Sequence, residues 1–100
     1  MAEDWRFAEP ENMAVISLRQ IVREGEPILH VTHDIEDDGW QFLGAGDAHP
    51  DDAIVVALRT VVRLDPSVQE LADLPPGWRA WRRTSKDAWE RSQQEAISSS

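Results

Sequence analysis

The sequence contains no cysteine and no long apolar segment. Without cysteine the chain can form no disulfide, no thiolate nucleophile and no cysteine-based zinc site. Its longest apolar run, "AIVVAL", is six residues long, whereas a membrane helix needs roughly 18. The N-terminal "MAEDW" has neither the basic nor the apolar region of a signal peptide. These absences predict a cytoplasmic protein.

Basic residues are scarce over the first three-quarters of the chain, and the net charge is −9. Residues 1–76 carry sixteen acids against five arginines, a balance of −11, whereas residues 77–100 carry five bases against three acids, a balance of +2. An acidic body repels phosphate backbones and anionic lipid. We therefore expect neither nucleic acid nor a membrane as partner, and a basic protein fits better. Solubility alone is the other explanation of the acidity.

The length and composition are those of one soluble domain. Of 100 residues, 41% are apolar and 29% are charged, which is enough for a single hydrophobic core. We assign the domain to residues 1–91 and a flexible tail to residues 92–100.

A sixteen-residue stretch occurs twice. Residues 8–23, "AEPENMAVISLRQIVR", align without a gap with residues 48–63, "AHPDDAIVVALRTVVR". Seven aligned pairs are identical: Ala8/Ala48, Pro10/Pro50, Val15/Val55, Leu18/Leu58, Arg19/Arg59, Val22/Val62 and Arg23/Arg63. Together with their flanks the copies cover residues 4–40 and 40–89, and this repetition indicates an internal duplication.

Each copy predicts a short strand that runs into a short helix. The segments "MAVIS" and "AIVVA" are rich in β-branched residues, which favour strands. A leading proline and a closing arginine are helix-terminus signals, so we place the change near Leu18 and Leu58. One continuous helix over 13–24 and over 53–64 is the alternative, because the apolar positions also fit a helical stripe.

The remaining segments predict strands, a hairpin turn and one more helix. Strands are predicted for residues 5–7, 27–35, 40–43, 77–83 and 88–91. Residues 36–39 form the turn of a hairpin, in which Gly39 supplies a positive φ. In "DPSVQELADLPPG", Asp65 caps a helix that begins at Pro66.

Together these elements predict an α+β fold. The single small domain consists of two copies of a strand–short helix–hairpin unit related by pseudo-two-fold symmetry. Its sheet is antiparallel or mixed, and the short helices cover one face. Each unit has too little apolar surface to be stable alone, so the copies share one core.

No grouping of residues points to catalysis, and we expect a protein that is not an enzyme and needs no cofactor. No pair of carboxylates has a visible reason to differ in pKa, and no serine lies in a nucleophile elbow. His30 and His33 are three residues apart, which places them on opposite faces of a strand.

The loop "GDAHPDD" offers a metal site as an alternative. It contains His49 among Asp47, Asp51 and Asp52, and carboxylate oxygens bind divalent cations. A metal-binding module or a metal-dependent hydrolase centred on residues 47–52 is therefore a second hypothesis.

Tryptophan is the most unusual component of the composition. The five tryptophans are Trp5, Trp40, Trp78, Trp81 and Trp89. Trp5, Trp40 and Trp89 recur at corresponding positions and supply apolar area to a small core. Trp78 and Trp81 face oppositely on a strand, so one of them lies outward among Arg79, Arg82 and Arg83. Exposed tryptophan beside arginine is typical of an interface hot spot.

Residues 38–89 resemble a known family. The features that carry the resemblance are "DGWQF", an acidic loop, an apolar run ending in "LRTVVRLDPS", then "LADLPPG" and a closing tryptophan. The chain resembles a family of small bacterial proteins of unknown function that includes predicted immunity proteins of polymorphic toxin systems. The resemblance implies an α+β fold and a non-enzymatic protein that neutralises a partner toxin.

The main functional hypothesis is a non-catalytic protein-binding module, immunity-like, that binds a basic partner through an acidic surface. A self-associating structural protein, with a second copy as partner, is a further alternative because a sheet edge can remain open. The predicted partner-binding residues are Asp34, Glu36, Asp37, Asp38, Asp47, Asp51, Asp52, Arg79, Trp81 and Arg83.

Overall fold

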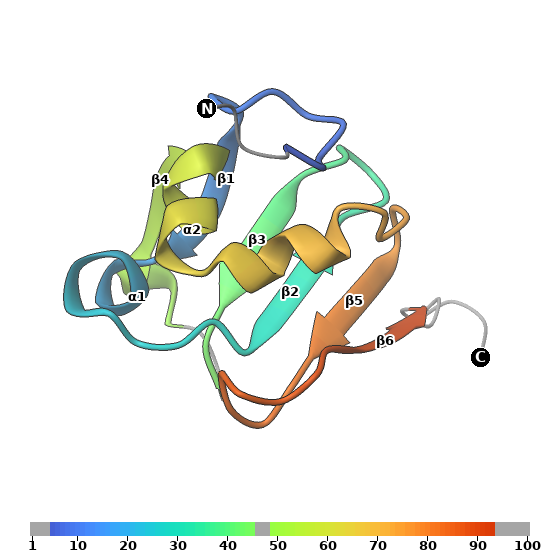
Figure 1. Ribbon diagram of the computed structural model, residues 1–100. Coiled ribbons are helices and arrows are strands. Elements are labelled where there is room, and N and C mark those ends of the chain that lie inside the picture. Colours follow the sequence, from blue (N-terminus) through green and yellow to red (C-terminus); the bar gives the residue numbers. More distant parts are fainter. Residues whose placement is uncertain (1–4, 46–48, 94–100) are drawn as a thin grey trace.

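The protein folds around a six-stranded sheet with the strand order β4-β1-β3-β2-β5-β6 (Figure 1). The computed structural model describes residues 5–45 and 49–93. The strands are β1 (Ala14–Leu18), β2 (His30–His33), β3 (Trp40–Leu43), β4 (Ala53–Ala57), β5 (Trp78–Trp81) and β6 (Glu90–Gln93). The helical segments are α1 (Arg19–Glu24), α2 (Leu58–Leu64) and the 3₁₀ helices η1 (Pro50–Asp52) and η2 (Pro66–Leu71). β1 and β3 are parallel and all other neighbours antiparallel, which confirms a small α+β domain with a mixed sheet.

Each copy of the repeat is a strand followed directly by a helix. β1 passes into α1 after Leu18, and β4 passes into α2 after Ala57. Both of these residues are extended, with φ and ψ of −117° and 146° for Leu18 and −75° and 145° for Ala57. The predicted change from strand to helix is therefore confirmed, and the alternative of one continuous helix is wrong.

The two copies pair with each other but have different neighbours. β1 and β4 are antiparallel, with Ile16 opposite Val55. β1 continues on its other side into β3, whereas β4 is the edge of the sheet. This strand order does not show the pseudo-two-fold symmetry that the repeat predicts for the whole domain.

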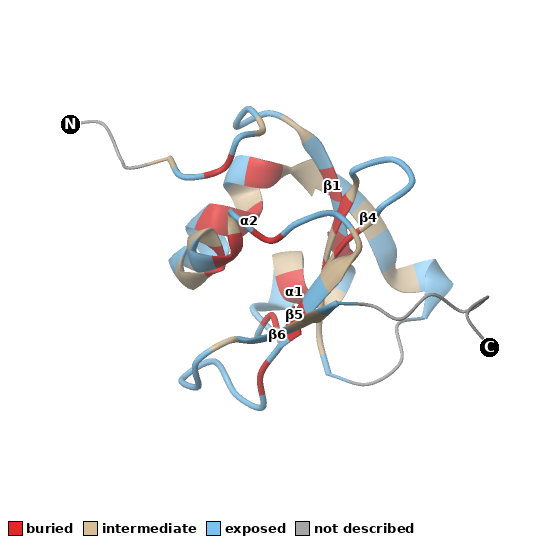
Figure 2. Cartoon of the chain, turned by 90° about the vertical axis from the view of Figure 1, so that its right-hand side faces the viewer, coloured by how far each residue is buried: buried red, intermediate tan, exposed pale blue. Residues whose placement is uncertain are grey.

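The core lies between one face of the sheet and the helical segments. In Figure 1, α2 lies over β4 and β1, and η2 crosses in front of β3 and β2; Figure 2 shows α2 on one side with β1 and β4 on the other. Buried apolar residues come from both copies, among them Val15 and Ile21 from the first and Leu58 and Val61 from the second. The prediction that the copies share one core is confirmed.

The opposite face of the sheet, here called the open face, bears side chains with substantial exposure. Along β4 and β1, Val55 is 68% exposed and Ile16 is 37% exposed, and on β5 Trp81 is 37% exposed. The continuous helix would have placed Val55 in a buried stripe, but strand alternation turns it outward instead. Over the described residues, no helix has the length and hydropathy needed to cross a bilayer.

Two predicted elements differ in kind from those observed. Residues 5–7 form no strand, because the indole of Trp5 donates to the Glu9 carbonyl at 2.8 Å and Phe7 packs edge-on against Trp40. The segment after Asp65 begins as predicted, but it is a 3₁₀ helix and not an α-helix. Its backbone bonds close over three residues, as in the 3.1 Å bond from Val68 N to the Asp65 carbonyl.

Three predicted boundaries differ as well. β2 begins at His30 and not at residue 27, since Pro27 has no N–H to donate to a ladder. β5 ends at Trp81, so it is shorter than the predicted residues 77–83. β6 includes Ser92 and Gln93, which were assigned to the tail; the rest of the predicted tail lies outside the described residues.

Candidate functional site

The turn between β2 and β3 is an acidic loop whose shape is held by its own carboxylates. The Asp34 carboxylate accepts from Glu36 N and the Asp37 carboxylate accepts from Gly39 N, both at 2.8 Å. The backbone closes with a bond of 2.8 Å from Asp34 N to the Gly39 carbonyl. Aspartates that bond to the backbone two residues on are typical of tight turns. The loop is thus ordered by local contacts.

The positive φ of this turn belongs to Asp38, at 58°, and not to Gly39 as predicted. Aspartate tolerates the left-handed region because its short polar side chain bonds locally. A Cβ at Gly39 would lie 2.9 Å from Asp37 Oδ1, the oxygen that accepts from Gly39 N. A side chain at this position would therefore require the Asp37 carboxylate to shift.

An exposed isoleucine sits within this acidic turn. Ile35 is 71% exposed, and it is bordered by Asp34 on one side and by Glu36, Asp37 and Asp38 on the other. Within residues 5–45 and 49–93, no lysine or arginine forms an ion pair with any of these four carboxylates. We call residues 34–38 the acidic turn. The predicted site residues omitted Ile35, although an isoleucine between acids in a hairpin turn is a visible signal in "DIEDD".

Beneath the acidic turn lies a buried histidine with one unpartnered nitrogen. His33 stacks on Trp40 at 4.0 Å between ring centroids, and its Nδ1 lies 2.7 Å from the Leu74 carbonyl. Because a carbonyl only accepts, we assign the proton of the neutral ring to Nδ1. Nε2 has no hydrogen-bond partner and lies 4.0 Å from carboxylate oxygens of Glu9 and Asp38. Two carboxylates therefore flank this buried nitrogen at the base of the turn.

The acids before β4 lie at the other end of the sheet. The strand registers place the β2–β3 turn beyond His33 and Trp40, while Asp51 and Asp52 precede Ala53 at the end marked by Leu18. The structure thus does not join these acids to the acidic turn in one surface. Asp47 lies outside the described residues.

Asp52 is engaged within the fold. Its carboxylate accepts from Arg19 Nη2 at 2.7 Å and from Gln20 Nε2 at 3.4 Å. The hydrogen bond from Arg19, followed by that from Gln20, lowers the pKa of Asp52 below its usual value of 3.8. This contact ties η1 to the start of α1, so Asp52 is a structural residue.

His49 is arranged as a helix cap. Its Nδ1 accepts from Asp51 N at 3.2 Å at the start of η1. In the part of the chain that the structure describes, no group of three or more histidine or carboxylate side chains is placed to hold a metal ion.

The predicted aromatic–arginine patch lies on the open face of β5. The guanidinium of Arg79 is 5.4 Å from the Trp81 ring centroid, and His30 is opposite Trp81 in the register. Burial, and then the charge of Arg79, lower the pKa of His30 below 6.5. These side chains border a hollow of about 340 Å³. Arg83 follows β5 and is exposed.

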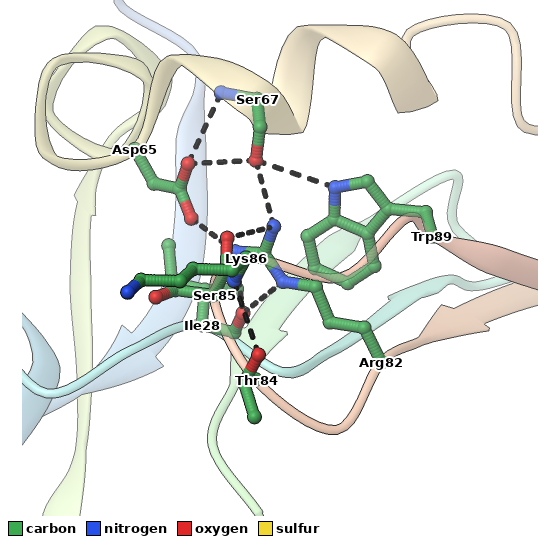
Figure 3. Close-up of polar contacts among 8 residues, drawn as sticks. All are labelled: Ile28, Asp65, Ser67, Arg82, Thr84, Ser85, Lys86 and Trp89. Carbon is green, nitrogen blue, oxygen red and sulfur yellow. Dashed lines mark hydrogen bonds and ion pairs between the residues drawn. The ribbon is translucent and has the colours of Figure 1, made fainter.

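Arg82 does not belong to that patch, contrary to the prediction. Its side chain is 1% exposed, and its guanidinium stacks 4.0 Å from the Trp89 ring centroid (Figure 3). It donates two bonds, of 3.0 and 3.1 Å, to the Ile28 carbonyl, one of 3.0 Å to the Ser67 hydroxyl, and one to the Asp65 carboxylate. Arg82 thus joins β5, η2 and the segment before β2.

Comparison of the chain with protein-family models, curated proteins and solved structures finds no match. The site must therefore be judged on its geometry. The only serine on a strand of the repeat, Ser17, is buried and donates its hydroxyl to the Phe42 carbonyl at 2.9 Å. Its hydroxyl proton is thus donated to a backbone carbonyl and not to a base. Among the described groups, the acidic turn has the features of a binding surface.

Proposed function

We propose that the protein is a non-catalytic protein-binding module whose acidic turn binds a basic partner. The observation that carries this proposal is Ile35, exposed on an ordered turn and surrounded by four carboxylates that have no lysine or arginine partner in the described chain. A surface used only for solubility needs acids, but it does not need a large apolar side chain among them.

The two components of this surface have different roles in binding. Carboxylates without an internal counter-ion attract cationic groups, which accelerates association and selects basic partners. Ile35 adds apolar contact, and full burial of such a side chain contributes about 1.5–3 kcal/mol. Because the loop is already ordered by Asp34 and Asp37, little conformational entropy is lost on binding.

The aromatic–arginine patch supplies a second contact in this proposal. Trp78 is opposite His33, near the acidic turn, and Trp81 is opposite His30. The patch of Arg79, Trp81 and Arg83 is therefore about 10 Å further along the strand direction. A partner that covers the acidic turn and extends over the open face reaches both.

The resemblance to the family that includes predicted immunity proteins supports a partner that is a toxin. A cytoplasmic location and an origin by internal duplication are further parts of the proposal, and both come from the sequence.

Affinity capture from an extract of the host tests the proposal. The bait is the full chain, compared with the variant Glu36→Gln/Asp37→Asn/Asp38→Asn and with Ile35→Ala. The matched control is Glu24→Gln/Glu26→Gln/Glu90→Gln, which removes the same charge at three exposed acids. α1 follows Leu18, and Glu90 is opposite Trp81, both at the end of the sheet away from the turn. We expect a basic protein that the native bait and the control retain and that both turn variants lose. Equal retention by all baits, or a captured partner that is acidic, contradicts the proposal.

A further inference from the structure

The two edges of the sheet differ in how they are protected. β6, "ERSQ", carries charged and polar residues, and Arg91 is paired with Asp73 at 2.8 Å. β4, "AIVVA", carries no charge, no proline and no polar side chain. Edge strands of monomeric proteins are normally blunted by charge, proline or a bulge. The edge of β4 has none of these, although Val55 at its centre is 68% exposed.

The backbone groups that β4 turns outward can be identified. Leu58 N donates to the Met13 carbonyl at 2.8 Å, and this pair continues the register in which Val15 is opposite Val56. Bonded and non-bonded pairs alternate in an antiparallel ladder. Val56 and Ile54 therefore bond to β1, whereas Val55 directs both its N–H and its C=O away from the sheet. On either side of it, the Ala53 N–H donates to the Pro50 carbonyl and the C=O of Ala57, the N-cap of α2, accepts within that helix. The Ala53 C=O and the Ala57 N–H are the outward groups that remain.

We propose that β4 pairs with β4 of a second copy of the chain, forming a two-fold symmetric dimer with one continuous sheet. An antiparallel register centred on Val55 uses all of the outward groups. The two Val55 residues exchange two hydrogen bonds, and the Ala57 N–H of each copy donates to the Ala53 C=O of the other. Registers centred on Ile54 or Val56 leave part of this set unpaired.

The charges at the ends of β4 select the same register. Asp51 and Arg59 are four residues before and four residues after Val55, in η1 and α2. This register therefore brings η1 of each copy toward the start of α2 of the other, where the two charges are opposite. Arg59 has no ion pair within the described residues. The Asp51 carboxylate lies 3.8 Å from His49 Nδ1, and the Asp51 carbonyl accepts from Arg19 Nη2 at 3.0 Å. Parallel pairing in register would place Asp51 against Asp51 and Arg59 against Arg59. In a closed two-fold dimer both β4 edges are paired with each other, so no further copy of the chain can add to the sheet at β4.

The dimer is independent of the proposed binding function. The acidic turn connects β2 and β3, which β1 separates from the edge strand β4, so pairing along β4 leaves the turn accessible. Pairing through one five-residue strand buries less than a standard interface, so we expect dissociation constants of about 1–100 µM.

Sedimentation of the full chain over a range of concentrations tests the dimer. We expect the native chain to pass from monomer to dimer as its concentration rises, and Val55→Lys, which places a charge on the edge, to remain a monomer. Circular dichroism verifies that the variant is folded. A native chain that is monomeric up to about 500 µM, well above the expected dissociation constant, overturns the proposal, and so does a dimer that persists in Val55→Lys.

Charge exchange tests the register. Two contacts of Asp51 with Arg59 are present by symmetry, so Arg59→Asp should raise the dimer dissociation constant about tenfold. The double variant Asp51→Arg/Arg59→Asp should restore it, whereas the control Arg63→Asp, one turn further along α2, should leave it unchanged. Failure of the double variant to restore dimerisation refutes the register centred on Val55.

A single introduced cysteine provides a test that does not depend on affinity. Because the chain has no cysteine, Val55→Cys carries one thiol at the proposed axis. Ile35→Cys, at a position of similar exposure, is the control. Under mild oxidation we expect disulfide-linked dimers to form several-fold faster from Val55→Cys; equal rates contradict the proposal.

Discussion

Replacing Arg82, the residue that follows β5, by methionine should destabilise the fold far more than replacing the arginine on that strand, Arg79. Methionine retains the packing against Trp89 but removes every guanidinium hydrogen bond shown in Figure 3. The Ile28 carbonyl loses both of its side-chain donors, at 3.0 and 3.1 Å, and the Asp65 carboxylate loses its cation. The variant therefore leaves the Ile28 carbonyl without a side-chain donor and Asp65 without its cation, while Asp65 Oδ1 still accepts from the backbone N–H and the hydroxyl of Ser67.

The size of the effect follows from these losses. Removing one partner of a buried ion pair costs about 3–5 kcal/mol, and an unsatisfied buried carbonyl costs about 1–3 kcal/mol. Asp65 is 20% exposed, so water replaces part of its lost interaction. We therefore expect the free energy of unfolding to fall by about 3 kcal/mol, near the lower end of the range for a buried pair.

Urea unfolding followed by tryptophan fluorescence measures this change. With a slope of about 1–3 kcal/mol per molar urea, the midpoint should fall by roughly 1–3 M. The matched control is Arg79→Met, an exposed arginine three residues earlier on β5, for which we expect a change within about 0.5 kcal/mol. If Arg82→Met lowers the unfolding free energy by less than about 1 kcal/mol, the role assigned to this network is refuted.

Two further predictions concern titrating groups. Burial and the charge of Arg79 lower the pKa of His30 below 6.5 in the folded chain. As the pH falls below 6.5, the unfolded chain therefore binds a proton at His30 before the folded chain does. His30 thus lowers the free energy of unfolding at acidic pH. His30→Gln should remove this part of the pH dependence, measured as urea midpoints above and below pH 6.5, and parallel profiles for the two proteins would contradict it. Arg19→Gln should raise the pKa of Asp52 toward 3.8, because the Arg19 guanidinium is the main cause of its lowering. NMR titration of the Asp52 carboxyl measures this pKa. An unchanged value in Arg19→Gln would show that Arg19 is not the cause of the lowered pKa.

The change from strand to helix in each repeat could be predicted because its causes are local. β-branched residues, which favour strands, precede Leu18 and Leu58. Arg23 and Arg63 then follow in the last turn of each helix, where a basic side chain is favoured. The failed prediction at residues 5–7 has the opposite origin. Alternation in "WRF" fits a strand, but Phe7 is fixed by contact with Trp40, which lies far along the chain.

The residues of the candidate site likewise divide into those that local sequence predicts and those whose role depends on contacts with distant parts of the chain. The acids of the turn could be read directly, and the opposite faces of Trp78 and Trp81 followed from strand alternation. The role of Arg82 could not be found, because its acceptor on Ile28 is 54 residues away in the chain. Sequence order likewise could not show that Asp51 and the acidic turn lie at opposite ends of the sheet.

Photo-crosslinking in the host cell tests the central claim most directly. A photoreactive residue is placed at Ile35, within the acidic turn, and for comparison at Leu64, an apolar residue on α2 that is 44% exposed. We predict a crosslinked adduct with a basic protein from position 35 and none with that protein from position 64. Absence of an adduct at position 35, or the same adduct in equal yield from both positions, would contradict the assignment of the acidic turn as the binding surface.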